Sequence, residues 1–204
     1  RNMSSAASDV YKRQIRARPL RTEPMSSPDV SVLLPARNAK STLGAALRSV
    51  QRQTLGNWEC VILDDGSRDE TFAIATGFSK SDPRFRVVRH PPRGLVDTLI
   101  DGIRLCEGPL IARMDADDCM HPERLARQSE MMEKHPTLSG AGCHVRLFPR
   151  HGLRPGRLAY ETWLNTMTTP EDIAREVFIE CPVAHPTLML RSSVLSELSY
   201  RSAG

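Results

Sequence analysis

The feature that most constrains the fold is an alternation of short apolar runs with helical patterns between residues 29 and 135. Runs at 30–34, 58–63, 84–90 and 108–114 are short and apolar, as expected of strands buried in a sheet. Between and after them, residues 38–53, 68–80, 94–106 and 122–135 have helical spacing of apolar residues. Strands that alternate with helices predict an α/β fold with a doubly wound, mostly parallel sheet and helices on both faces.

Each predicted strand is followed by an unusual polar motif. The motifs are PARN, DDGS, RHPPRG and DADD, in chain order. In a doubly wound sheet, ligands bind beyond the carboxyl ends of the strands, where these motifs would gather. The sequence therefore predicts a polar ligand site at this edge.

The last motif contains Asp115, Asp117 and Asp118. If the chain stays extended, Asp115 and Asp117 point to the same side. Two converging carboxylates can hold a hard divalent cation, Mg²⁺ or Mn²⁺, which would offset the charge of a diphosphate leaving group. The alternative is a solvated acidic loop in which Asp118 caps the next helix.

The other motifs contain further candidate ligand contacts. Asp64 or Asp65 can accept a hydrogen bond from a nucleobase or a ribose hydroxyl, or cap the helix that follows. Arg37 and Arg93 can each contact phosphate or pair with these aspartates.

Aromatic and histidine side chains add weaker candidates. His90, His121 and His185 are candidate ligands or bases, although a histidine beside proline in a turn is more often structural. We expect Trp58 and Trp163 to lie in the core.

Charge and cysteine content exclude several classes of protein. The chain has a net charge of +4, and residues 1–28 account for all of it with six basic and two acidic residues. The remainder is neutral, which argues against a nucleic-acid partner. Five scattered cysteines without a CxxC pair argue against a disulfide scaffold or a structural zinc site and favour a cytoplasmic protein.

The first 28 residues have little apolar periodicity, and we expect a disordered tail. The string DVYKRQ, from Asp9 to Gln14, resembles what one frame of a sequencing-library transposase adapter encodes. Our hypothesis is that about the first fifteen residues are adapter-derived and non-native, with a natural basic tail as the alternative.

Taken together, four segments resemble the glycosyltransferase family 2 pattern on the GT-A fold, which is Rossmann-like. They are VSVLLPARNAKSTLGAALRSVQRQT, WECVILDDGSRDET, RHPPRGLVDTLIDGI and GPLIARMDADDCMHPERLARQ. The resemblance is strong from Asp29 to Gln128 and weak over VAHPTLMLRSSVL and YRSAG. It implies transfer of a sugar from a nucleotide-diphosphate sugar, with UDP-sugar favoured, to a glycan, lipid or protein acceptor, usually with inversion.

The resemblance also assigns roles to individual residues. It implies that Asp117 is the main ligand of Mn²⁺ or Mg²⁺ and that Asp115 lies near ribose and metal. The implied donor nucleotide contacts are Pro35, Ala36, Arg37, Asp64, Asp65, Arg93, Gly94 and Asp115. A bacterial role in cell-surface polysaccharide synthesis would fit, and attachment at the cytoplasmic face of the membrane stays open.

Two departures from the family pattern affect this reading. Asp97 and Asp101 occupy a helix in which such proteins often carry asparagine. The family's catalytic base follows a GGYR-like sequence, whereas this chain has LSYRSAG up to Gly204, and nothing aligns Glu171 or Glu180 with that role. We therefore expect a fragment, with a nucleotide-sugar-binding half at 29–135 and an incomplete acceptor half at 136–204.

Two other functions stay open. A nucleotidyltransferase would share nucleotide and metal chemistry, although it more often has a glycine-rich, basic loop after the first strand. A degenerate nucleotide-binding module without catalysis would need no base.

Overall fold

The structure is a computed structural model that describes residues 27–197. The predicted tail lies outside the described residues except for Ser27 and Pro28, and the segment from Leu198 to Gly204 lies outside them as well.

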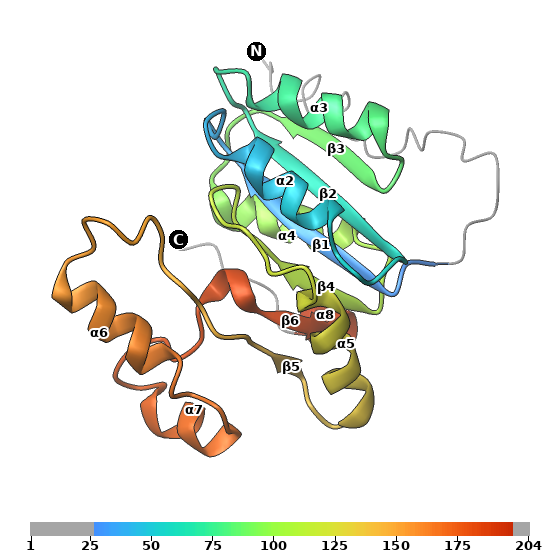
Figure 1. Cartoon of the computed structure of the whole chain (residues 1–204). Helices are drawn as coiled ribbons and strands as arrows, with labels where there is room; N and C mark the ends of the chain where they lie inside the picture. The colour runs from blue at the N-terminus through green and yellow to red at the C-terminus, as the bar shows by residue number, and fades with distance from the viewer. Residues whose placement is uncertain (1–26, 198–204) are drawn as a thin grey trace, which may run out of the picture.

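A six-stranded sheet forms the centre of the described chain (Figure 1). Its order is β3-β2-β1-β4-β6-β5; β6 runs antiparallel to both of its neighbours, β4 and β5, and the other pairings are parallel. The strands are β1 Val30–Ala36, β2 Trp58–Asp65, β3 Phe85–His90, β4 Leu110–Arg113, β5 Gly140–Ala141 and β6 Met189–Arg191. The mostly parallel sheet confirms the predicted fold class.

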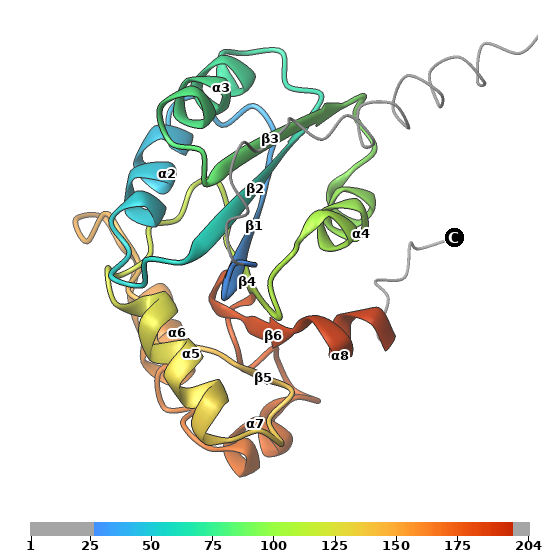
Figure 2. The same cartoon turned by 90° about the vertical axis from the view of Figure 1, so that its right-hand side faces the viewer.

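Helices cover both faces of the sheet (Figure 2). One face carries α2 Leu43–Gln51, α3 Thr71–Ser81 and α5 Arg124–Lys134, and the other carries α4 Leu95–Leu105 and α8 Ser192–Glu197. Successive strand residues point to opposite faces, so Val32 packs in the α2 core while Leu33 packs against Leu99 of α4. Burial on both faces explains why these strands are continuous apolar runs.

The first two strands extend further than their apolar runs. β1 includes Pro35, which pairs with Leu63 of β2. The pairing of β1 with β4 ends at Leu33, whose carbonyl accepts a hydrogen bond from Met114 N. Because residues two apart in a strand face the same way, the backbone nitrogen of Pro35 points toward the β4 side of β1, as the backbone of Leu33 does. The pairing with β4 has already ended there, so the missing N–H of Pro35 removes no hydrogen bond between strands.

Two helices begin later than the helical patterns at 68–80 and 122–135 predict. Asp69 and Glu70 precede α3, because the Asp69 carboxylate accepts hydrogen bonds from Thr71 N and Oγ1. No side chain caps α5, so Asp118 does not cap it, and α5 begins at Arg124, two residues after Pro122.

The carboxyl-terminal region of the described chain also differs from expectation. Residues 138–149 contain only the two-residue strand Gly140–Ala141. Trp58 is buried and packs edge-on against Phe85, whereas Trp163 is half-buried and stacks on Tyr160 outside the main core.

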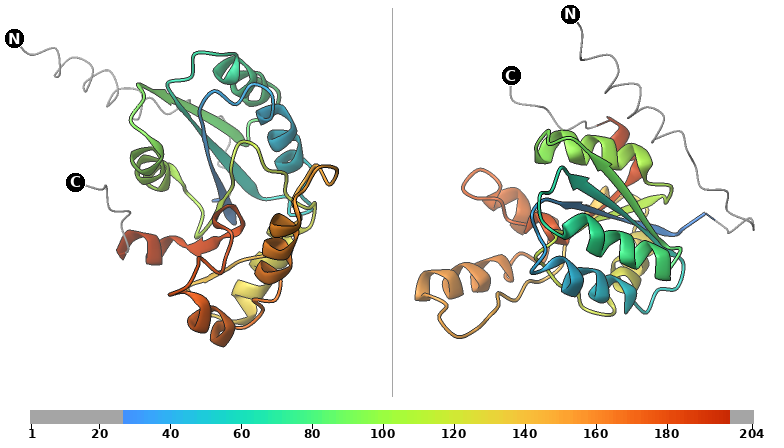
Figure 3. Two further views of the ribbon diagram at one scale, coloured as in Figure 1. Left: turned by 90° about the vertical axis from the view of Figure 1, so that its left-hand side faces the viewer. Right: turned by 90° about the horizontal axis from the view of Figure 1, so that it is seen from above.

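A lobe made of α6 Pro155–Leu164, α7 Pro170–Glu176 and their flanking loops projects from the body that contains the sheet (Figures 1 and 3). The chain returns from this lobe through the short 3-10 helix η1, His185–Thr187, to β6. Among residues 27–197, no helix combines the length and apolar character needed to cross a bilayer.

Candidate functional site

A cavity of about 450 Å³ opens at the carboxyl edge of the sheet, beside the ends of β1, β2 and β4. The loops after β1, β3 and β4 and the last residue of β2 contribute to its wall. The lining residues are Pro35, Ala36, Arg37, Asn38, Ala39, Ser41, Thr42, Asp65, Gly94, Leu95, Thr98, Asp115, Ala116 and Asp117. The structure therefore brings the predicted polar motifs together around one space, as the parallel arrangement of the strands requires.

The end of β1 and the loop after it form one side of the cavity, which we call the first wall. Pro35 and Ala36 are its last two residues, and both are buried. Arg37 follows them with half of its side chain exposed, and its Nη1 lies 3.4 Å from Asp65 Oδ2. A partly exposed guanidinium held loosely by one carboxylate can turn toward an incoming phosphate.

Asp65, the last residue of β2, is buried and firmly oriented. Its Oδ1 accepts a hydrogen bond from Arg93 N at 2.7 Å, and its Oδ2 accepts one from Gly94 N at 3.1 Å. The ring of His90 also approaches, with Nδ1 3.4 Å from Oδ1. Two backbone donors thus fix the direction in which this carboxylate faces the cavity.

Asp64 occupies a different environment from its neighbour. Its side chain is fully buried, its Oδ1 accepts a hydrogen bond from Ser67 N at 3.3 Å, and its Oδ2 lies 3.0 Å from Arg89 Nε. Adjacent strand residues point to opposite faces, so only one of the two aspartates can face the cavity. In this structure, Asp65 is the one that lines it.

Arg93 and Gly94 form the turn between β3 and α4. Gly94 lines the cavity with a φ of 92°, a conformation that favours glycine. The Arg93 guanidinium pairs with Asp101 of α4, which also lies 3.4 Å from Arg104 Nη1. Neither Arg93 nor Asp101 is among the residues that line the cavity, and the Arg93 backbone supports Asp65, which does line it.

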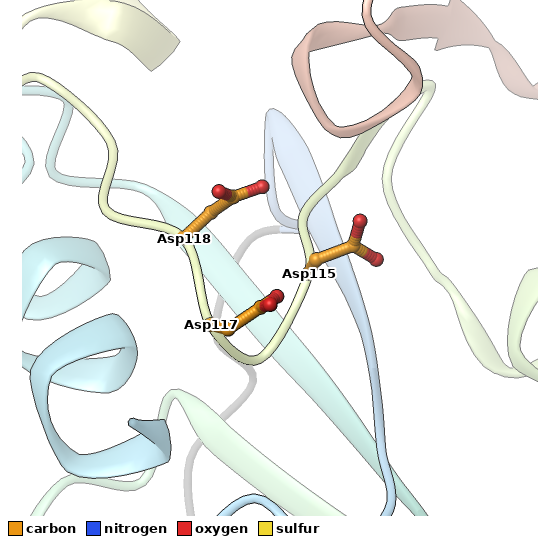
Figure 4. A group of neighbouring side chains, drawn as sticks. All are labelled: Asp115, Asp117 and Asp118. Carbon is orange, nitrogen blue, oxygen red and sulfur yellow. The ribbon is translucent and has the colours of Figure 1, made fainter. Parts of the chain in front are cut away.

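The loop between β4 and α5 carries the acidic cluster (Figure 4). Asp115, Asp117 and Asp118 leave this loop toward one side, and each offers a carboxylate oxygen within 4.8 Å of the others. Burial, together with the charges of Asp115 and Asp117, raises the pKa of Asp118. Three converging hard oxygen donors fit the ligand preference of Mg²⁺ or Mn²⁺.

Asp115 also pairs with an arginine that lies next to this cluster. Arg113, at the end of β4, is buried, and its Nη2 lies 2.7 Å from Asp115 Oδ1. Asp117 is exposed, and its side chain has no hydrogen bond or ion pair with any residue in the described chain. Asp117 is therefore the member most available to a cation.

A set of cross-loop hydrogen bonds, which we call the clasp, joins residues 38–40 after β1 to residues 67–71 after β2. Asn38 adopts a positive φ of 50° and stands at its centre. The bonds are Asn38 N to Ser67 Oγ at 2.9 Å, Arg68 N to Asn38 Oδ1 at 2.9 Å, Ala39 N to Thr71 Oγ1 at 2.7 Å and Lys40 N to Asp69 Oδ2 at 3.1 Å. The clasp fixes the loop that forms the first wall of the cavity.

Sequence reasoning missed several lining residues. Asn38, Ser41 and Thr42 all belong to the polar run directly after Pro35-Ala36-Arg37. An asparagine immediately after a strand and an arginine was the available signal, because asparagine tolerates the left-handed backbone that tight turns use. Leu95 and Thr98, on the first turn of α4, gave no comparable signal.

The three candidate histidines lie in different places. His90 is buried behind Asp65, and His121 is exposed, with its ring nitrogen accepting a hydrogen bond from Glu123 N at 3.3 Å. His185 begins η1, near Arg113 and Asp115, and partial burial and the Arg113 charge lower its pKa.

Solved structures with the same architecture define the class of fold. The described chain resembles TarS 1–349 from S. aureus, with a TM-score of 0.63 and 20% identity over 83% of this chain and 48% of that chain. It also resembles the mannosyltransferase PcManGT from Pyrobaculum calidifontis, with a TM-score of 0.65 and 19% identity over 97% of this chain and 55% of that one. The fold is therefore of the GT-A type.

The family follows from the sequence itself. Residues 31–198 match the family described as glycosyl transferase family 2, and this chain belongs to that family. It is 31% identical over 180 residues to the putative glycosyltransferase EpsE of Bacillus subtilis, covering 87% of this chain and 62% of EpsE. It is 27% identical to an uncharacterized glycosyltransferase of Haemophilus influenzae, covering 83% of this chain and 54% of that protein. The chain thus spans between half and two thirds of these relatives.

Proposed function

We propose that this chain is the donor-binding part of a glycosyltransferase that moves a sugar from a nucleotide-diphosphate sugar to an acceptor hydroxyl. The observation that carries the proposal is the convergence of Arg37, Asp65, Asp115 and Asp117 on one cavity of about 450 Å³. A cavity of this size lies within the range of roughly 300–1,000 Å³ for small-molecule sites. A nucleotide diphosphate requires a cationic side chain, a hydrogen-bond acceptor and carboxylates that can hold a metal, and this cavity contains all three.

The proposed donor contacts divide between the two ends of the cavity. Pro35 and Ala36 line the nucleoside end, where Asp65 accepts a hydrogen bond from the base, and Asp64 supports the turn from behind. Arg37, with Gly94 across the cavity, lies where it can face phosphate. A UDP-sugar is favoured, and structures of TarS with UDP-GlcNAc and of PcManGT with GDP-Man and Mn²⁺ support a nucleotide-sugar donor in general.

Asp117, with Asp115 beside it, would hold Mn²⁺ or Mg²⁺. The fit rests on the three carboxylate oxygens within 4.8 Å and on the uncommitted side chain of Asp117. When bound, such a cation supplies charge that stabilises the departing diphosphate. Arg113 orients Asp115, and its buried guanidinium offsets part of the negative charge that the cluster concentrates.

Inverting transfer requires a base to take the proton of the attacking hydroxyl. The carboxylates that line the cavity are Asp65, Asp115 and Asp117, and each already has a proposed role in binding the donor or the metal. We therefore propose that this chain binds the donor but turns over little. Every lining residue falls between 35 and 117, which supports 29–135 as the donor half and 136–204 as the acceptor half.

The test is a calorimetric titration of the purified chain with UDP, GDP and CDP, with and without Mn²⁺. We expect Mn²⁺-dependent binding that is strongest for one base and that Asp117→Asn weakens at least about tenfold. Glu133→Gln is the matched control. Glu133 is exposed on α5, outside the cavity, and its substitution also removes one negative charge.

Two results would overturn the proposal. If the folded wild-type chain binds none of the three nucleotides, the cavity is not a donor site in this chain. If Asp117→Asn and Glu133→Gln weaken binding equally, the acidic cluster contributes only general charge. Appreciable sugar transfer by the purified chain would contradict the narrower proposal that it turns over little.

A further inference from the structure

A basic segment that the donor site does not use lies between residues 144 and 157. It contains four arginines and two histidines and no aspartate or glutamate: His144, Arg146, Arg150, His151, Arg154 and Arg157. All six residues are exposed. The concentration is local, because residues 27–197 as a whole have nearly equal numbers of basic and acidic residues.

Within residues 27–197, Arg150 is the one arginine of this segment that forms an ion pair. Arg150 Nη1 lies 2.8 and 2.7 Å from the two carboxylate oxygens of Glu161, which also accepts a hydrogen bond from Leu147 N. Arg146, Arg154 and Arg157 form no ion pair with any carboxylate in the described part of the chain. Three cationic side chains therefore face solvent from one loop and the start of one helix.

Two of these arginines lie where their positive charge destabilises the isolated protein. Arg154 is the N-cap of α6 and Arg157 is its third residue, and the first turn contains no acidic residue. Cations near a helix N-terminus interact unfavourably with the helix dipole. A nearby anionic surface would turn this cost into an attraction.

Exposed apolar side chains occur on the same lobe. Phe148 lies within the basic segment with 57% of its surface exposed. Phe178 and Ile179, just after α7, are 94% and 77% exposed and are the most exposed large hydrophobic residues of the described chain. Figures 1 and 3 show that α6, α7 and their loops stand out from the body around the sheet. A soluble polyanion would leave these apolar side chains in water, whereas a bilayer interface accepts both kinds of group.

We propose that the segment 144–157 docks this protein on an anionic lipid bilayer, with its arginines at the headgroups and Phe148 in the interface. Juxtaposed basic and aromatic side chains bind such surfaces through electrostatic attraction and apolar burial. The proposal concerns a surface outside the donor cavity and does not depend on the proposed activity.

Vesicle sedimentation of the full chain tests the proposal, with phosphatidylcholine vesicles that contain or lack phosphatidylglycerol. We expect binding only to the anionic vesicles and a decrease at high salt. Arg146→Gln, Arg154→Gln and Arg157→Gln together should lower the partition coefficient roughly 100-fold, since each arginine near such a surface contributes about 1 kcal/mol. Phe148→Ser should lower it about tenfold.

The matched control replaces Arg52, Arg68 and Arg127, which are exposed on the body, with glutamine. Residues 1–28 are basic and give a background common to all variants, so the comparison is between the two triple variants. The lobe variant should retain its circular dichroism spectrum and melt no lower than the wild type, because its arginines oppose the helix dipole.

Several outcomes would overturn the proposal. If both triple variants lose the same amount of vesicle binding, net charge alone explains the binding and the segment has no special role. If the wild-type protein binds neutral vesicles as well as anionic ones, the attraction is not electrostatic. Binding to soluble polyphosphate as tightly as to vesicles, with no effect of Phe148→Ser on either, would assign the segment to a polyanionic partner instead.

Discussion

Replacing Asp117 with asparagine should have opposite effects on the protein without and with a divalent cation. Asp117 has no hydrogen bond or ion pair in the described chain, so the substitution removes a charge without breaking a contact. That charge lies in a cluster with the carboxylates of Asp115 and Asp118, whose oxygens are within 4.8 Å. The wild-type protein without metal therefore contains repulsion that the variant lacks.

The size of this repulsion follows from Coulomb's law. At the 4.8 Å separation that bounds the cluster, one pair of charges in water repels by about 0.9 kcal/mol. Screening at physiological ionic strength reduces this value by about half. Two pairs then cost about 1 kcal/mol, which corresponds to a rise in Tm of roughly 2–4 °C for a chain of this size.

Under the proposed function, binding of Mn²⁺ with UDP should reverse the order of the two melting temperatures. At a free ligand concentration 100 times Kd, wild-type protein gains about 2.7 kcal/mol of stability. Asp117→Asn should lose most of this gain because it lacks the proposed main ligand. Differential scanning calorimetry in EDTA and in Mn²⁺ with UDP should therefore show the variant melting above wild type in the first buffer and below it in the second.

The salt dependence provides an internal control. In EDTA, the advantage of the variant should shrink at high salt, because the repulsion is screened. A variant that melts below wild type in EDTA would show that Asp117 stabilises the apoprotein through a contact and would refute the electrostatic reasoning. Equal stabilisation of both proteins by Mn²⁺ and UDP would refute the metal assignment.

Three further changes test other parts of the structure. Because burial and like charges raise the pKa of Asp118, stability should fall as pH rises from the ordinary aspartate range through the raised pKa, and Asp118→Asn should flatten this fall in pH-dependent urea titrations. Gly102→Ala would place Cβ in steric overlap with Leu33 Cδ1, and the overpacking should lower the unfolding free energy by about 1–3 kcal/mol in urea. Gly66→Ala would combine a φ of 65° with a Cβ 2.5 Å from Pro92 Cδ, so it should cost at least about 1 kcal/mol in the same assay and weaken nucleotide binding in calorimetry.

The parts of the fold that were predictable depend on burial and on parallel topology. Val30–Leu34 and Trp58–Leu63 could be recognised as strands because a sheet covered on both faces needs continuous apolar residues. The gathering of the polar motifs followed from parallel strands that end at a common edge. The GT-A fold and family membership were likewise indicated by motifs in order and spacing.

The remaining features depend on contacts between residues far apart in sequence. Neither Asp64 nor Asp65 could be preferred from sequence, because the choice depends on the strand face and on the backbone donors of Arg93 and Gly94, which follow Asp65 by 28 and 29 residues. Helix boundaries shifted for a similar reason, since Asp69 bonds to Lys40 N across the clasp and to Thr71 and so precedes α3. The side of α5 that packs on the sheet is settled in the same way, because Met131 is 47% exposed whereas its neighbour Met132 is buried.

The clasp between residues 38–40 and 67–71 also bears on the kinetics of association. Its four hydrogen bonds order the loop after β1 when the protein folds, before any ligand arrives. If the cavity binds a nucleotide as proposed, that ligand meets a wall that is already in place, and binding need not include the loss of loop entropy that slows and weakens association with mobile sites. We therefore expect the association rate of the proposed nucleotide to depend on diffusion and charge rather than on rearrangement of this loop.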